Sequence, residues 1–167
     1  MIDPIDSLIL APVAGLSLWC AWTDLARRRI PNAAVLVLAA LYPAAHAAGA
    51  LPGAWWAGVL VGGLLFALGL VGFALGTLGG GDVKLAAALG LWAGSSDLAG
   101  FALVTALAGA GLSLAILATR NVPFGNLLSS PLQAGPQTDG HVPRESVPYG
   151  VALAAGGLWI AYGLIAA

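Results

Sequence analysis

The chain has 167 residues, of which 60% are hydrophobic and 8% charged, whereas an ordinary soluble domain carries about 25% charged residues. This composition excludes a typical water-soluble globule. Six basic and seven acidic residues give a net charge of −1, which provides no basic surface for a nucleic-acid partner. The single cysteine, Cys20, excludes both an internal disulfide and a four-cysteine zinc site.

Long uncharged segments separate the few charged residues. A membrane-spanning helix needs about 20 mostly apolar residues, and the uncharged stretch 30–81 is long enough for two. We therefore predict an all-α, polytopic membrane protein that forms one membrane-embedded domain over residues 1–167, with about six transmembrane helices. These helices are expected at residues 7–24, 33–50, 55–78, 83–95, 98–118 and 147–166. The fourth is short, which suits a tilted or partly re-entrant helix.

The basic residues indicate how these helices are oriented. Lysine and arginine collect on the cytoplasmic side of membrane proteins, and an outside N-terminus places all of them there. They are Arg27, Arg28, Arg29, Lys84, Arg120 and Arg144. The sequence thus predicts an N-out, C-out protein, and the absence of Lys or Arg before the first apolar segment argues against a cleaved signal peptide. The polar segment 120–147 is expected to be a cytoplasmic loop, either a linker or a lid over a site.

Glycine and tryptophan patterns predict how the helices pack and where they meet the membrane surface. Glycines four residues apart favour close helix contacts in lipid. These pairs are Gly58 with Gly62, Gly72 with Gly76, and Gly90 with Gly94. The tryptophans expected at the two membrane interfaces are Trp19 and Trp22 on one side, and Trp55, Trp56 and Trp92 on the other.

Two aspartates stand beside the predicted cytoplasmic membrane face. Asp24 ends the first helix, where Arg27 or Arg28 could form an ordinary ion pair with it. Asp82 follows Gly79 to Gly81, an arrangement that also suits a helix C-cap followed by an N-cap. Two carboxylates that share one proton can activate water and protonate a carbonyl, which is aspartyl protease chemistry without a metal or cofactor.

Residues around these aspartates have expected supporting roles. Gly79, Gly80 and Gly81 leave room for an extended substrate backbone, so they are candidate substrate-binding residues. Lys84 is a further candidate for positioning, although the positive-inside rule explains it as well. Asn32, which follows a proline, is expected to cap the start of the second helix.

Three segments resemble the type IV prepilin peptidases, which are membrane-embedded aspartyl proteases of the GxGD class. The segments are Asp24 to Arg29 with Ile30-Pro31-Asn32, Gly79-Gly80-Gly81-Asp82-Val83-Lys84-Leu85, and Val147-Pro148-Tyr149-Gly150-Val151-Ala152. The resemblance runs from about residue 7 to the C-terminus. It implies that Asp24 and Asp82 are the catalytic pair. It also implies removal of a short basic leader from prepilins at the cytoplasmic face of the bacterial inner membrane.

The chain is most similar to the short form of this family that accompanies tight-adherence (Flp) pili. It lacks the additional N-terminal domain with paired cysteines that is associated with N-methylation, so the resemblance implies peptidase activity alone. The expected partners are the prepilin substrate, the lipid bilayer and the pilus assembly machinery.

Two other classes of function compete with a peptidase. Glycine-broken helices with a buried carboxylate also build the ion sites of small transporters and channel subunits. However, such a site is expected near the middle of the membrane, whereas both aspartates are predicted at one interface. A purely structural partner of a secretion machine is the other alternative, and it would not need either carboxylate.

Overall fold

Every regular element in the described part of the chain is a helix. The computed structural model describes residues 4–51, 53–120 and 148–166. The helices are α1 (Pro4–Arg27), α2 (Asn32–Ala47), α3 (Trp55–Ala74), α4 (Gly80–Arg120) and α6 (Tyr149–Ala166). The all-α prediction is confirmed. Beyond Arg120, the expected 120–147 loop lies outside the described residues.

The fourth and fifth predicted helices are two limbs of one element, α4. The limbs meet at Gly94, whose φ of 54° and ψ of −162° are not helical. Residues with a side chain rarely adopt this conformation, so glycine permits the chain to reverse there. The break expected between the helices at 83–95 and 98–118 therefore lies within a few residues of Gly94.

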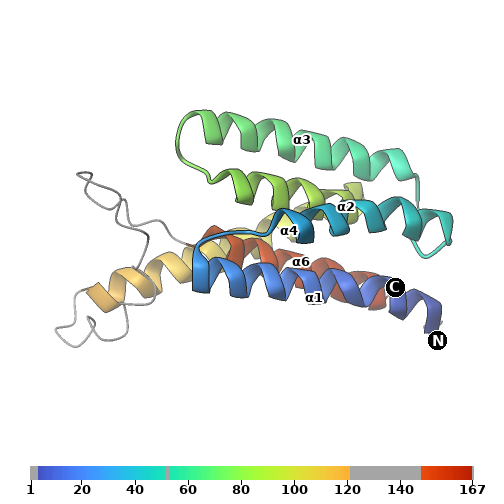
Figure 1. Cartoon of the computed structure of the whole chain (residues 1–167), viewed down its shortest axis with the longest axis horizontal. Coiled ribbons are helices and arrows are strands. Elements are labelled where there is room, and N and C mark those ends of the chain that lie inside the picture. The colour runs from blue at the N-terminus through green and yellow to red at the C-terminus, as the bar shows by residue number, and fades with distance from the viewer. Residues whose placement is uncertain (1–3, 52, 121–147, 167) are drawn as a thin grey trace.

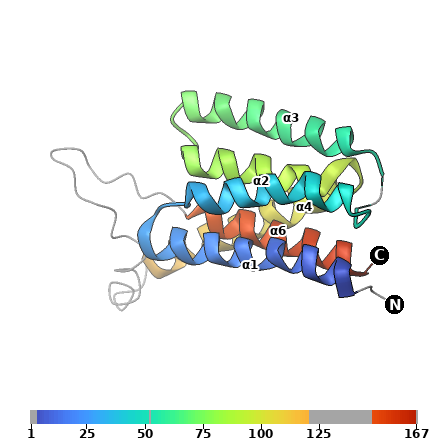
Figure 2. The same cartoon turned by 45° about the vertical axis from the view of Figure 1, so that its right-hand side comes forward.

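The helices run in alternating directions along the long axis of the bundle (Figure 1). The start of α1, the Gly94 turn and the end of α6 lie at one end. At the other end lie the end of α1 and the starts of α2, α4 and α6. A second view shows α1 and α6 side by side, and the two helices pack against each other (Figure 2). This topology places Asp24 and Asp82 at the same end of the molecule.

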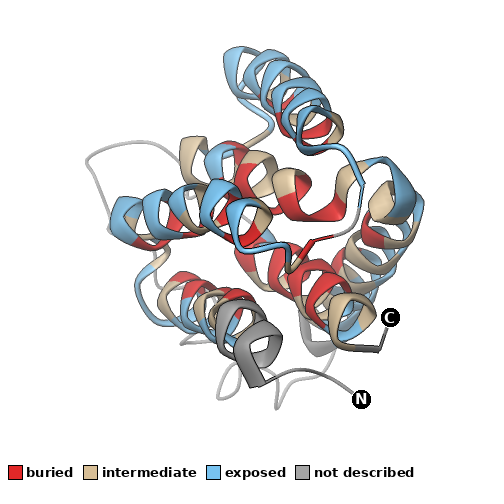
Figure 3. Cartoon of the chain, turned by 90° about the vertical axis from the view of Figure 1, so that its right-hand side faces the viewer, coloured by how far each residue is buried: buried red, intermediate tan, exposed pale blue. Residues whose placement is uncertain are grey.

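Helix α4 is central, since it packs against α2, α3 and α6. The largest fully buried side chains of the core include Leu38, Leu85, Leu89 and Ile160, which come from α2, α4 and α6. Helix α3 lies on the outside of the bundle and is largely exposed (Figure 3). Its exposed side chains are apolar, among them Leu60, Leu64, Leu68 and Val71. A surface of this kind suits contact with lipid tails.

Length and composition identify two helices of the described chain that could cross a membrane, Trp55–Ala74 and Gly80–Ala118. The apolar helices Asn32–Ala47 and Tyr149–Ile165 are shorter. Since a buried core helix can pass the same test, the number of spans and their orientation stay predictions.

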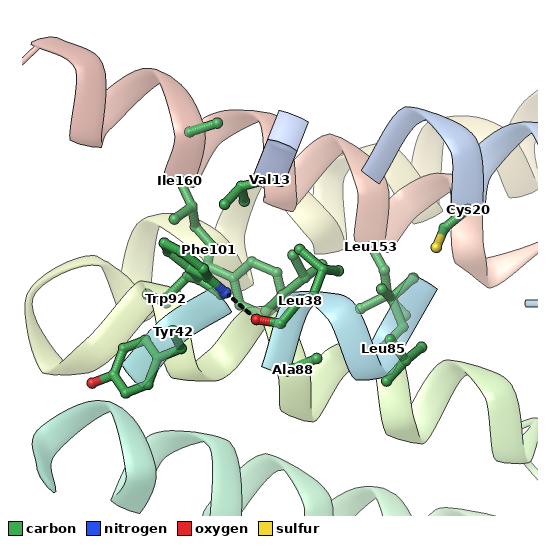
Figure 4. Close-up of a cluster of buried hydrophobic side chains, with 14 of the residues drawn as sticks. Val13, Cys20, Leu38, Tyr42, Leu85, Ala88, Trp92, Phe101, Leu153 and Ile160 are labelled. Atoms are coloured by element: carbon green, nitrogen blue, oxygen red, sulfur yellow. Dashed lines mark hydrogen bonds between the residues drawn. The ribbon is translucent and has the colours of Figure 1, made fainter. Parts of the chain in front are cut away.

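The expectation that Trp92 anchors the protein at the membrane interface is wrong. Its side chain is 3% exposed, and its Nε1 donates a hydrogen bond to the Leu38 carbonyl oxygen at 3.0 Å (Figure 4). The ring also meets Tyr42 edge-to-face, with 5.9 Å between centroids. Trp92 therefore joins α4 to α2 inside the core, because its indole N–H finds a buried acceptor there. The other four tryptophans of the prediction are exposed, namely Trp19, Trp22, Trp55 and Trp56.

The glycine pattern has two different explanations in the structure. Gly58, Gly62 and Gly90 mark a close approach of α3 and α4, as expected. For example, a Cβ atom on Gly62 would lie 2.9 Å from the Ala87 carbonyl oxygen. Gly76 and Gly94 instead have φ of 70° and 54°, so they serve chain reversals and not helix packing.

Candidate active site

Asp24 lies in the last turn of α1, against the first turn of α6. Its side chain is 7% exposed, and its Oδ2 accepts a hydrogen bond from the Gly150 N–H at 2.9 Å. The chain leaves α1 at Arg28, whose φ of 51° is the left-handed conformation that commonly follows a helix. The turn brings α2 back along the bundle and leaves Asp24 enclosed between helices.

Asp82 lies in the first turn of α4, where its carboxylate accepts a hydrogen bond from the Gly79 backbone N–H. This bond is one half of a capping box, in which the third helical residue bonds back to the N-cap amide; Gly79 has no side chain to make the reciprocal bond. The sequence also allows Asp82 to be the N-cap of this helix. That interpretation is wrong, because the helix begins at Gly80 and Asp82 is its third residue. Gly79 to Gly81 are not the C-cap of α3 either. That helix ends at Ala74, and the chain reverses direction at Gly76.

The charge of Asp24 acts on the Asp82 carboxylate. Arg28, one helical turn beyond Asp24, also interacts electrostatically with the Asp24 carboxylate. An interaction of Asp24 with Arg28 is thus compatible with its pairing with Asp82, which stays a prediction. Two neighbouring carboxylates can share a proton, so that one acts as a base while the other acts as an acid.

A comparison with protein families decides between the functions that such a pair allows. The model of the type IV leader peptidase family matches residues 12–114, which is more than half of the chain and includes both Asp24 and Asp82. The chain belongs to the type IV leader peptidase family. It is thus a membrane protein and an aspartic prepilin leader peptidase. No curated protein and no solved structure matches the chain.

Family membership favours the enzyme over the transporter, channel and structural alternatives. It also implies that the substrate is a prepilin and that the reaction is leader cleavage. The roles of individual residues in this peptidase rest on the geometry of the site.

The three glycines before Asp82 lie near other groups of the peptidase, although none of them is fully buried. A Cβ atom on Gly79 would lie 2.8 Å from Asp82 Oδ2, and one on Gly81 would lie 3.2 Å from Ile30 Cβ. Gly80 is less tightly enclosed, with Phe73 3.4 Å away. The missing side chains thus allow the Asp82 carboxylate and the Ile30 loop to approach the chain. Their expected contact with substrate stays a prediction.

Lys84 connects α4 to α2. Its Nζ donates a hydrogen bond to Asn32 Oδ1 at 3.3 Å, on the exposed side of the site. The expectation that Asn32 caps α2 is wrong, because Pro31 holds the N-cap position and makes no side-chain capping bond. The Asn32 side chain instead accepts from Lys84, which holds the starts of α2 and α4 together.

Another aspartate, Asp97, does not join this pair. Asp97 lies beside Ser96, whose hydroxyl donates to it at 3.3 Å, just after the Gly94 turn at the opposite end of the bundle. Across the described residues, no group of three His, Cys, Asp or Glu side chains could hold a metal ion.

Sequence reasoning did not assign a role to Gly150. Its segment was noted for its resemblance to the start of the last helix of the family, but the contact with Asp24 joins residues 126 apart in sequence. Periodicity and spacing carry no signal for such a contact.

Proposed function

We propose that Asp24 and Asp82 are the catalytic pair with which this peptidase removes the short basic leader of Flp-type prepilins. The observation that carries this proposal is the location of both carboxylates at one end of the bundle, where the charge of Asp24 acts on Asp82. The two residues lie 58 positions apart in sequence, so only the fold of the bundle brings them to the same end.

The chemistry of this pair is hydrolysis by an activated water. One carboxylate takes a proton from water as the water oxygen bonds to the carbonyl carbon of the scissile peptide. The other, protonated, gives its proton to the carbonyl oxygen. The tetrahedral intermediate then collapses, the C–N bond breaks, and a proton passes to the leaving amine. No metal or cofactor is required for these steps.

The site is proposed to face the cytoplasm of a bacterial inner membrane, with six spans and both chain ends outside. The basic residues Arg27, Arg28 and Lys84 lie near the end of the bundle that holds the aspartates, which agrees with the positive-inside rule. A reporter that is active only in the cytoplasm should be inactive at the C-terminus and active when inserted in the 120–147 loop. Activity of the C-terminal fusion would overturn this orientation.

Co-expression with prepilins tests the substrate. The wild-type peptidase is expected to shorten an Flp-type prepilin, with the mature pilin carrying an unmodified N-terminal amine as measured by mass spectrometry. A type IV prepilin from a system with the longer, methylating form of the peptidase serves as the comparison. Cleavage of that comparison substrate alone would overturn the Flp assignment, and a methylated product would overturn the expectation of peptidase activity without N-methylation.

A further inference from the structure

The N-terminus of α6 takes part in the site through one buried backbone contact. The Gly150 N–H, in the first turn of α6, donates to Asp24 Oδ2 at 2.9 Å. Backbone N–H groups in the first turn of a helix have no acceptor within that helix, so this one is available to a carboxylate. A hydrogen bond to a charged oxygen is shorter and stronger than one between neutral groups. The positive end of the helix dipole adds to it.

The side chain of Asp24 leaves no room for a Cβ atom at position 150, which explains the glycine there. Among the described glycines, Gly150 is not one of those with a positive φ, so its backbone angles do not demand glycine. Instead, a Cβ atom there would lie 2.7 Å from Oδ2, 2.8 Å from Cγ and 2.9 Å from Cβ of Asp24. Real Cβ atoms essentially never approach other atoms so closely. Only glycine lets the α6 backbone reach the carboxylate.

Packing along α1 and α6 holds this contact in place. The two helices lie side by side, and Pro148, directly before α6, is fully buried (Figure 2). Further along α6, Gly157 allows a second close approach, since a Cβ atom there would collide with the Ser17 side chain of α1. The start of α6 therefore has little freedom to move relative to Asp24.

We propose that Gly150 is a positioning residue for leader cleavage, whose N–H holds the Asp24 carboxylate in place beside Asp82. This inference rests on the proposed catalytic role of the two aspartates. It extends the site to a segment outside residues 12–114, the part of the chain that matches the family model. A carboxylate at the end of a side chain can rotate, and the fixed amide restricts it to one arrangement. Small displacements of reacting groups can lower rates by about 100-fold.

The variant Gly150→Ala tests this role by placing a methyl group against Asp24. We expect kcat for prepilin cleavage to fall by about 10-fold to 100-fold while KM changes less than about twofold, because substrate binding is left intact. Gly163→Ala is the matched control on the same helix, where the nearest atom to the new Cβ would be Asp97 Oδ1 at 4.0 Å. This control should keep the kcat of the wild type.

Thermal unfolding tests the contact independently of activity and covers the case in which Gly150→Ala is poorly folded. Gly150→Ala should lower Tm in the wild-type background, but should have little effect in an Asp24→Gly background, where the Oδ2, Cγ and Cβ atoms that the new methyl group would strike are all absent. An equal loss of Tm in both backgrounds would overturn the inference. So would a kcat for Gly150→Ala equal to that of Gly163→Ala, or an effect on KM alone.

The proposed function and this inference fail in different ways. If the wild type cleaves no prepilin, or if Asp24→Asn cleaves normally, the proposed function fails and the positioning role falls with it. If the wild type cleaves and the aspartate variants do not, while Gly150→Ala behaves like its control, only the positioning role is wrong.

Discussion

Replacing either aspartate by asparagine is expected to lower kcat for leader removal by about 100-fold to 10,000-fold, the range in which general acid–base groups contribute. Asparagine has nearly the size of aspartate but cannot take up or release the proton. At position 24 its amide oxygen can still accept the Gly150 N–H, so the local structure should survive. The measurement is the rate of cleavage of a purified prepilin by Asp24→Asn and Asp82→Asn.

Asp97→Asn provides the matched control for both variants. It makes the same chemical change at the opposite end of the bundle, and it should cleave at the wild-type rate. Since the two carboxylates act as one unit, the double variant should be no slower than the slower single variant. Cleavage by either single variant at the rate of Asp97→Asn would remove that aspartate from the mechanism.

Trp92→Ala is expected to lower the free energy of unfolding by about 3–5 kcal/mol, as for other large-to-small changes of buried aromatic residues. The substitution removes a side chain that is 3% exposed and also the hydrogen bond from its Nε1 to the Leu38 carbonyl oxygen. Both losses fall on the contact between α4 and α2. Denaturant or thermal unfolding of the detergent-solubilised protein measures the effect.

Trp56→Ala is the control, because this side chain is 55% exposed at the start of α3. It should change stability by less than about 1 kcal/mol, as for surface substitutions in general. If the two variants lose equal stability, Trp92 is not buried in the core, and the expectation that it lies at the membrane interface is correct.

Sequence periodicity and charge placement predicted much of this fold. Uncharged apolar segments predict the approximate bounds of the helices, including a break between the two limbs of α4 within a few residues of Gly94. The family, and with it the class of enzyme, was recognised from the segments around Asp24 and Asp82 and is confirmed by the family match. These features are visible in sequence because each depends on residues that are close neighbours along the chain.

Predictions failed where a side chain has a partner far along the chain. Asn32 was expected to cap its own helix, but its side chain accepts from Lys84, 52 residues away. Trp92 was expected to be an anchor at the membrane interface, but its indole N–H donates to the carbonyl oxygen of Leu38, 54 residues away. Both assignments followed local preferences of the residue type, which tertiary contacts readily override.

The sequence by itself determined that the protein is built from apolar helices and carries only a few charges, because lipid excludes unpaired charge and requires satisfied backbone groups. Because charged residues are so few, Asp24 and Asp82 stand out as the candidate pair. Only the tertiary structure decided that the charge of Asp24 acts on Asp82, that the Asp82 carboxylate accepts from the Gly79 N–H, and that the Gly150 N–H reaches Asp24. Such contacts depend on how whole helices pack, and a close approach between distant backbone and side-chain atoms leaves no periodic pattern in the chain.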